Sequence, residues 1–257
     1  MEQFFTTEVL SALLTLTFLE IVLGIDNILF VSIIAGKLPE SKQKKAIGIG
    51  LAMAMIIRLV LLLGISFLMR MQQVWLKIDN EFIHTEISGQ AIILFLGGLF
   101  LLYKSTKEIY EKVEHDSQKP ITANGQSTIA QAILQITLIN LVFSTDSILT
   151  ALGMSNGLPY AGLVMGTAIV ISVLIMMLFA HPVGDFVSRH PSLQVLGLSF
   201  LLLIGFMLVA EAAHLSHTEI LNRSVGSIPK GYLYFAIAFS LGIEFINMKM
   251  RKKQKPL

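Results

Sequence analysis

Long apolar stretches follow one another along almost the whole chain and constrain its fold more than any other feature. A helix needs about 20 apolar residues to cross a bilayer. Only 14% of the 257 residues are charged, against about 25% in an average soluble domain. The sequence therefore predicts an all-α polytopic membrane protein with seven transmembrane helices embedded in the lipid bilayer, at roughly 9–34, 46–69, 88–104, 128–152, 159–180, 195–213 and 231–248.

The basic residues of the loops predict the orientation in the membrane. Fourteen of the nineteen Lys and Arg residues fall after the first, third and fifth spans or in the C-terminal segment, and four fall in the opposite loops. Because cytoplasmic loops carry the excess of positive charge, we expect the N-terminus outside and the C-terminus in the cytoplasm. The first span lacks the basic start and the cleavage site of a signal peptide, so we expect it to be retained.

Two of the spans contain nearly the same segment. TFLEIVLGIDNIL at 17–29 and TLINLVFSTDSIL at 137–149 share five identical residues, and both place an aspartate within an apolar helix. Three spans in each half give the second half the opposite polarity in the membrane, as in the inverted repeats of many secondary transporters. We expect a single transmembrane domain over 1–257, with repeats at about 9–104 and 128–213, a cytoplasmic linker at about 105–127 and a final helix at about 231–248.

Polar side chains in these two spans predict a metal site. An acid inside a membrane is costly and usually functional. Carboxylate, amide and hydroxyl oxygens are hard ligands that suit Mn²⁺, Ca²⁺ and Mg²⁺, and the chain has no cysteine. The rival interpretation is that these groups only hydrogen-bond neighbouring helices. The candidate ligands are Glu20, Asp26, Asn27, Asn140, Asp146 and Ser147.

Helix geometry adds a condition to this site. On a straight α-helix the side chains of Glu20 and Asp26 point about 120° apart, which is poor geometry for shared coordination. The first span must therefore bend or unwind, and Gly24 is the candidate position; Ser144 and Thr145 are the candidates in the second copy. Unwinding would also free backbone carbonyls as ligands.

Three further ionisable residues lie within the spans. Arg58 falls in the second span, Glu211 near the end of the sixth and Glu244 in the seventh. They are candidate charge partners or relay groups for the predicted site. Glu211 and Glu244 lie nearer the membrane interfaces, where a solvated role is an equal alternative.

At LEIVLGIDNILFVS and NLVFSTDSILTALG the chain resembles the TerC family of bacterial integral membrane proteins, and LGGLFLLYKSTKEI and HPVGDFVSRHPSLQVLGLSFLLLIGF extend the resemblance over most of its length. The resemblance implies a seven-helix inner-membrane transporter, related to the lysine-exporter group, that exports Mn²⁺ or a similar ion. Family members are associated with tellurite resistance and with metal supply to secreted enzymes. The family's metal-site acids match Glu20, Asp26 and Asp146, whereas Asn140 stands where relatives often carry an acid.

These observations favour an exporter of a divalent cation, Mn²⁺ above Ca²⁺ or Mg²⁺, that works by alternating access. No Walker motif and no catalytic signature is visible, so we expect neither ATP-driven transport nor enzyme activity. We expect no tightly bound cofactor and no nucleic-acid partner. The alternatives are a non-transporting membrane scaffold or metal-delivery partner, and an exporter of a small organic cation or amino acid. A homo-oligomer and membrane partner proteins remain open.

Overall fold

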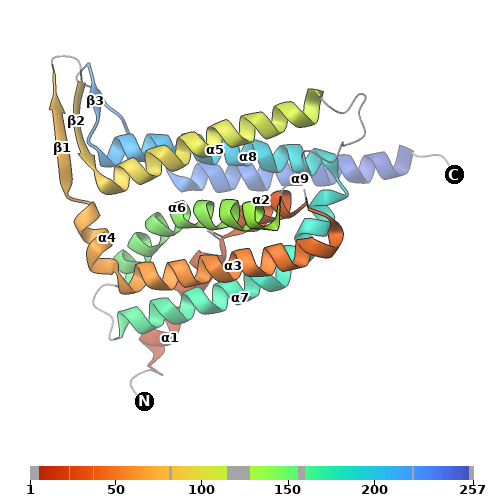
Figure 1. The fold of residues 1–257 in the computed structure, drawn as a ribbon, viewed down its shortest axis with the longest axis horizontal. Coiled ribbons are helices and arrows are strands. Elements are labelled where there is room, and N and C mark those ends of the chain that lie inside the picture. Colours follow the sequence, from red (N-terminus) through yellow and green to blue (C-terminus); the bar gives the residue numbers. More distant parts are fainter. Residues whose placement is uncertain are drawn as a thin grey trace. The chain divides into compact units, whose positions relative to one another are not determined.

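The computed structural model describes residues 6–22, 24–36, 38–80, 83–114, 128–155, 160–221 and 223–254 (Figure 1). The chain forms two compact units, Met1–Gln73 with Ile121–Ser188 and Val74–Pro120 with Arg189–Leu257. The elements in chain order are α1 (Thr7–Val22), α2 (Ile25–Ala35), α3 (Glu40–Leu63), α4 (Ile65–Met71), β1 (Val74–Asp79), β2 (Ile83–Ser88), α5 (Gly89–Glu114), α6 (Ile129–Ser155), α7 (Ala161–Ser188), α8 (Pro191–Leu215), β3 (Glu219–Ile220), β4 (Arg223–Ser224) and α9 (Lys230–Gln254).

Five helices in the described part of the chain are long and apolar enough to cross a membrane: α3, α5, α7, α8 and α9. The first predicted span is divided between two shorter helices, α1 and α2. The fourth lies in α6, which runs from Ile129 to Ser155. The structure thus supports a polytopic membrane protein, and the count of seven spans stays a prediction.

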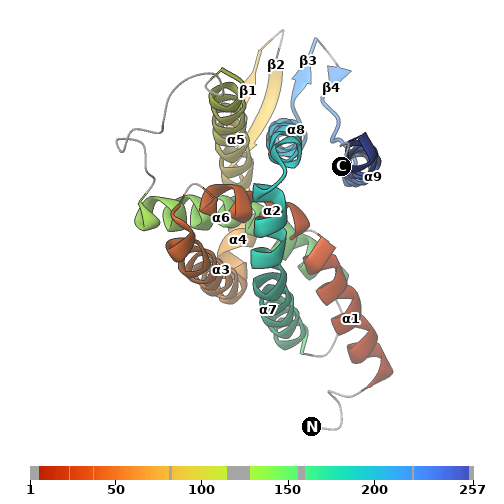
Figure 2. The same ribbon diagram turned by 90° about the vertical axis from the view of Figure 1, so that its right-hand side faces the viewer.

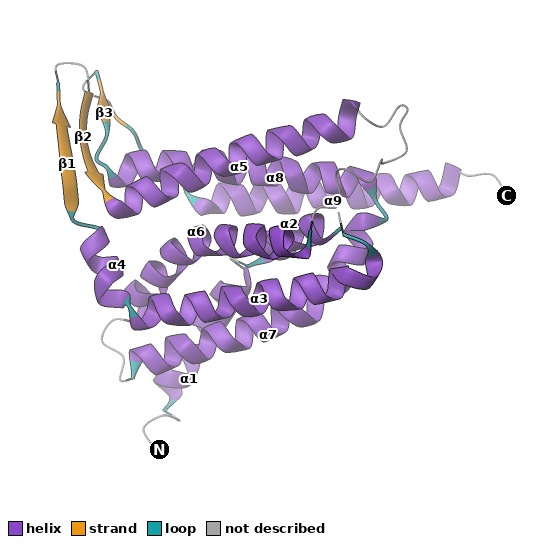
Figure 3. Cartoon of the chain, in the orientation of Figure 1, coloured by secondary structure: helices purple, strands orange, loops and turns teal. Residues whose placement is uncertain are grey.

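The chain is mostly helical, but it is not all-α as expected, because the second unit contains four short strands in an antiparallel sheet of order β1-β2-β3-β4. Strands β1, β2 and β3 are labelled in Figure 3. The segments VWLKID and IHTEIS contain several β-branched and aromatic residues, which favour strands. Lys77 pairs with Glu86 across the sheet and donates a hydrogen bond to it, with Nζ and Oε1 2.5 Å apart. This bond lowers the pKa of the Glu86 carboxyl below its ordinary value.

Helices α5 and α8 form the centre of the second unit (Figure 2). Strand β2 leads into α5, strand β3 follows α8, and the two strands pair, so the two helices run antiparallel. They approach closely at Gly98 and Gly205: a Cβ atom added to Gly98 would lie 2.7 Å from the Gly205 carbonyl oxygen. Glycine is needed here because any side chain would meet the backbone of the other helix.

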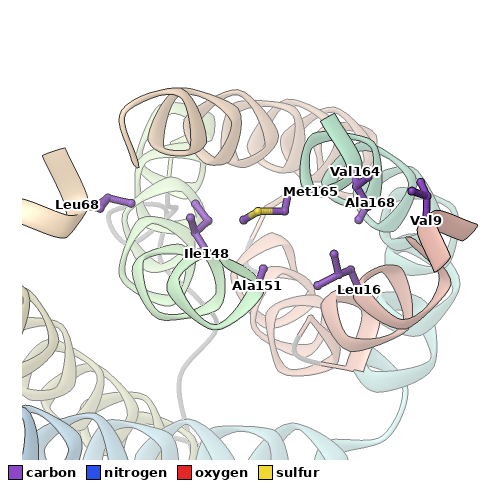
Figure 4. Close-up of a cluster of buried hydrophobic side chains, with 8 residues drawn as sticks. All are labelled: Val9, Leu16, Leu68, Ile148, Ala151, Val164, Met165 and Ala168. Atoms are coloured by element: carbon purple, nitrogen blue, oxygen red, sulfur yellow. The ribbon is translucent and has the colours of Figure 1, made fainter. Parts of the chain in front are cut away.

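In the first unit, α1 and α2 pack on α7, α6 packs on α3, and α3 contacts α7. The colour gradient in Figure 1 shows α1 and α2 running in the direction opposite to α6. Four helices contribute to a buried apolar cluster beside them (Figure 4). The cluster's members come from α1, α4, α6 and α7; they are Val9, Leu16, Leu68, Ile148, Ala151, Val164, Met165 and Ala168.

Candidate functional site

The first predicted span is interrupted where Glu20 and Asp26 would need it to be. Helix α1 ends at Val22 and α2 begins at Ile25, with Gly24 as the N-cap of α2 at φ −100° and ψ −3°. The Gly24 amide donates to the Ile21 carbonyl at 3.0 Å, and the Gly24 carbonyl accepts from Ile28 at 3.0 Å. Helix α1 therefore ends two residues after Glu20, and α2 begins one residue before Asp26.

Gly24 also leaves room for a neighbour from α7. A Cβ atom on Gly24 would overlap the Met176 sulfur and lie 3.0 Å from the Glu20 carbonyl oxygen. We expect Gly24→Ala to lower the free energy of unfolding by about 1–3 kcal/mol, because the Met176 side chain must move within a packed interior. Thermal unfolding in detergent measures the effect.

The second variant Met176→Ala separates the two contacts at Gly24. If crowding is the cause, Gly24→Ala should cost less in the Met176→Ala background than in the wild type. Gly153→Ala is the matched control, since nothing lies within 4 Å of a Cβ added to Gly153 on α6. An equal cost in both backgrounds would mean that the backbone at Gly24, and not the sulfur of Met176, sets the requirement for glycine.

Glu20 on α1 and Arg58 on α3 form a buried ion pair. Glu20 Oε2 and Arg58 Nη1 are 2.7 Å apart, and each residue is 2% exposed. Two opposite charges at this separation form a neutral unit, which lowers the cost of placing them among apolar helices. The arrangement is a carboxylate held in the interior by a charge partner from the second predicted span.

The same arginine reaches α6. Arg58 Nε donates to Ser144 Oγ at 3.0 Å, and the Ser144 hydroxyl donates in turn to the Asn140 carbonyl. The side-chain amide of Asn140 donates to the Ile136 carbonyl at 2.9 Å, within its own helix. Arg58 therefore joins α1 and α6, the helices that carry the two matching segments.

Ser144 and Thr145 were expected to bend or unwind α6, and the unwinding is wrong, because α6 continues from Ile129 to Ser155. Both hydroxyls bond to carbonyls one turn earlier, Thr145 Oγ1 to Leu141 at 3.1 Å. Such bonds satisfy a buried hydroxyl without breaking the helix. Sequence reasoning treated Ser144 only as a bending point and missed its contact with Arg58. Its position one turn after Asn140 on a polar face was the available signal.

The remaining predicted site residues fall into three groups. Ser147 is buried on α6, and its hydroxyl donates to the Ser144 carbonyl at 3.4 Å. Glu211 on α8 and Glu244 on α9 belong to the second unit, where Glu244 Oε2 accepts from Asn247 at 3.5 Å. The side chains of Asp26 and Asn27 on α2 and of Asp146 on α6 lie outside the described residues.

The structure thus brings together Glu20, Arg58, Asn140 and Ser144 in the first unit. Among the side chains that are described, no three of His, Asp and Glu lie close enough to hold a metal ion. The described part of the site is one buried carboxylate, its guanidinium partner, and the hydroxyl and backbone groups of α6.

Comparison with known proteins identifies the family of this chain. The sequence model of the integral membrane protein TerC family matches residues 5–256. The UPF0053 inner membrane protein YgdQ of Escherichia coli (strain K12) is 44% identical over 246 residues, which cover 96% of this chain and 94% of that protein. A UPF0053 protein of Haemophilus influenzae is 41% identical over 244 residues, 95% of each chain. The UPF0053 inner membrane protein YoaE of E. coli is 40% identical over 253 residues, 98% of this chain and 45% of that protein.

No solved structure matches the chain. The family resemblance inferred from the two aspartate segments is confirmed by the match over nearly the whole chain and by relatives at 40–44% identity. Together with the five apolar helices long enough to span a membrane, these matches lead to one conclusion: the chain is a polytopic membrane protein and belongs to the integral membrane protein TerC family.

Proposed function

We propose that this protein is a secondary transporter that exports a divalent cation, most favourably Mn²⁺, by alternating access. The carboxylates of Glu20, Asp26 and Asp146 provide the charge for the ion, and Asn27, Asn140 and Ser147 provide neutral oxygens. The transported ion is cargo and not a resident cofactor. No enzyme activity is part of the proposal.

The observation that carries the proposal is the interrupted helix beside a buried acid. Irregular backbone and acidic groups are both expensive in a membrane, and proteins keep them where an ion or substrate passes. Here the two costs occur together, since Glu20 is 2% exposed and α1 ends two residues later, at Val22. Discontinuous helices of this kind form the ion sites of many secondary transporters.

The packing of the first unit supports an inverted repeat. If the first three predicted spans correspond to the next three, α1 and α2 correspond to α6, and α3 corresponds to α7. Exchanging the halves then turns the contact of α1 and α2 with α7 into the contact of α6 with α3, and both are present. The contact of α3 with α7 is unchanged by the exchange.

The second unit also supports an inverted repeat, through α5 and α8, which are the third spans of the two halves. Aligning GGLFLLYK at 97–104 with IGFMLVAE at 204–211 matches Gly98 with Gly205. These two glycines lie against each other at the closest approach of the helices. Contact between equivalent residues is what a two-fold relation between antiparallel helices produces at its axis.

Arg58 gives the proposed site a built-in competitor. Its guanidinium lies against the Glu20 carboxylate at 2.7 Å. A cation that binds Glu20 must share this carboxylate or displace the arginine from it. Because Arg58 is also bonded to Ser144, a movement of Arg58 would change its contacts with both α1 and α6. This is a physical route by which ion binding could bias the relative positions of the two helices.

The candidate ligands support the choice of ion, and the relatives support the choice of membrane. Carboxylate, amide and hydroxyl oxygens suit hard divalent cations. Two similar proteins of E. coli are named inner membrane proteins, and we place this chain in the same membrane. The positive charge of the loops puts the C-terminus in the cytoplasm.

Transport of Mn²⁺ into proteoliposomes tests the proposal. We expect the wild type to move Mn²⁺, and Asp26→Asn or Asp146→Asn to reduce the initial rate at least tenfold, since each change removes one ligand charge from a site in a low-dielectric interior. Asp185→Asn is the matched control, because Asp185 lies on α7 in the same unit with its side chain 48% exposed. It should transport at the wild-type rate.

Other results would point elsewhere. The exporter proposal would be overturned if the wild type showed no Mn²⁺ flux, or if Asp26→Asn and Asp146→Asn both showed the wild-type flux. Uptake of an amino acid in place of Mn²⁺ would favour export of a small organic solute. Binding of a membrane or secreted partner without flux would favour a scaffold or metal-delivery role.

A further inference from the structure

Two threonine hydroxyls are buried in the first unit without a hydrogen-bond partner among the described residues: Thr17 Oγ1 on α1 and Thr137 Oγ1 on α6. Leaving a buried hydroxyl unpaired costs about 1–3 kcal/mol. A helical threonine can avoid this cost by bonding to the carbonyl four residues earlier. Thr15 does so at 2.8 Å on α1, and Thr145 does so at 3.1 Å on α6. Thr17 and Thr137 depart from the behaviour of neighbours on their own helices.

The two threonines occupy equivalent positions in the matching segments. Both stand at the start of the shared thirteen-residue pattern, 120 residues apart. Each lies three residues before the polar residue of its copy, Glu20 or Asn140. Residues three apart on a helix are neighbours on one face, with Cβ atoms about 5–6 Å apart. The unpaired hydroxyls therefore lie about one turn from the groups of the candidate site.

The direction of the helices puts the two hydroxyls on opposite sides of that site. Arg58 bonds to both Glu20 and Ser144, which brings these two residues to a similar level. Thr17 lies about 4.5 Å before Glu20 along α1, and Thr137 about 10 Å before Ser144 along α6. Because α1 and α6 run in opposite directions, these displacements point to opposite ends of the unit (Figure 1).

We propose that Thr17 and Thr137 line the two approaches to the Glu20 site, one from each face of the membrane, and that their hydroxyl oxygens contact the divalent cation or its hydration water as it passes. A neutral hydroxyl is a hard ligand that replaces a lost water without holding the ion strongly. Each copy of the repeat thus supplies one such position. This inference rests on the proposed transport function and adds residues and a path to it.

The alternative is that both threonines only fill space. The isosteric changes Thr17→Val and Thr137→Val distinguish these possibilities, since they keep the shape and remove the hydroxyl. The assay is Mn²⁺ transport in inside-out and right-side-out membrane vesicles. We expect each variant to raise the half-saturating Mn²⁺ concentration about three- to tenfold from one face, with the two variants acting on opposite faces.

Stability provides a second measurement. Since neither hydroxyl has a partner among the described groups, the thermal unfolding midpoint of both variants should equal or exceed that of the wild type. Thr15→Val is the matched control on α1: it removes a hydroxyl that has a partner and should leave the half-saturating concentration unchanged.

Three results would overturn the inference: unchanged half-saturation in both variants, effects of both on the same face, or a loss of stability with normal transport. Wild-type vesicles that move no Mn²⁺ would overturn the proposed function itself. If the wild type transports Mn²⁺ and both valine variants transport it equally well, only the role of the threonines is overturned.

Discussion

Glu20→Leu should destabilise the first unit by about 3–5 kcal/mol, because it leaves Arg58 buried with its charge unpaired. Arg58→Met should have a similar effect by leaving the Glu20 carboxylate without its partner. Both residues are 2% exposed, so neither remaining charge can easily turn to water. The thermal unfolding midpoint of the purified protein in detergent measures both losses.

The double variant Glu20→Leu/Arg58→Met separates stability from transport. Replacing a whole buried ion pair with apolar residues of similar volume is often neutral or stabilising. We therefore expect the double variant to unfold close to the wild-type temperature. It should still fail to transport Mn²⁺, because the ion has lost the Glu20 carboxylate. Full transport by this stable variant would show that Glu20 is not a ligand.

An exposed ion pair on another helix provides the control. Lys107 and Glu111 on α5 are 3.9 Å apart and about half exposed. Such pairs contribute about 0–1 kcal/mol, so Lys107→Met should barely change the unfolding midpoint. A loss comparable to that of Arg58→Met would contradict the assignment of the large effect to burial of the Glu20–Arg58 pair.

Gly98→Val should disrupt the packing of α5 on α8 and cost about 3 kcal/mol of stability. A Cβ atom at Gly98 would lie 2.7 Å from the Gly205 carbonyl oxygen and 3.0 Å from the Val209 amide nitrogen. These are backbone atoms, so no change of rotamer relieves the contact and the helices must separate. Gly98→Ala should already show part of the loss.

Gly242→Ala on α9 is the matched control, since nothing lies within 4 Å of a Cβ added there. Alanine favours the helix by up to about 1 kcal/mol, so this variant should be as stable as the wild type or slightly more stable. If Gly98→Ala and Gly242→Ala behave alike in thermal unfolding, the close approach of α5 and α8 does not depend on Gly98.

Local patterns in the sequence predicted several features correctly. Hydropathy and length identified the membrane-spanning character of α3, α5, α7, α8 and α9. The angle between Glu20 and Asp26 required a bend near Gly24, and the structure has an interruption there. These predictions succeeded because helix length and side-chain direction depend on residues close together in the chain.

Predictions that required knowledge of neighbours failed or were incomplete. Ser144 and Thr145 looked able to unwind α6, but carbonyls of the preceding turn satisfy both hydroxyls and the helix continues. The strands β1 and β2 were missed because a short segment forms a strand only when another strand pairs with it, and β2 pairs with β1 and β3.

The sequence by itself determined that this chain spans a membrane, that two of its segments repeat an acid-containing pattern, and that it resembles the TerC family. Only the tertiary structure decided that Arg58 pairs with Glu20 and Ser144, and that Thr17 and Thr137 lack partners among the described residues. The physical reason is distance along the chain. Arg58 is 38 residues from Glu20 and 86 from Ser144, so only the packing of α1, α3 and α6 brings the three side chains together.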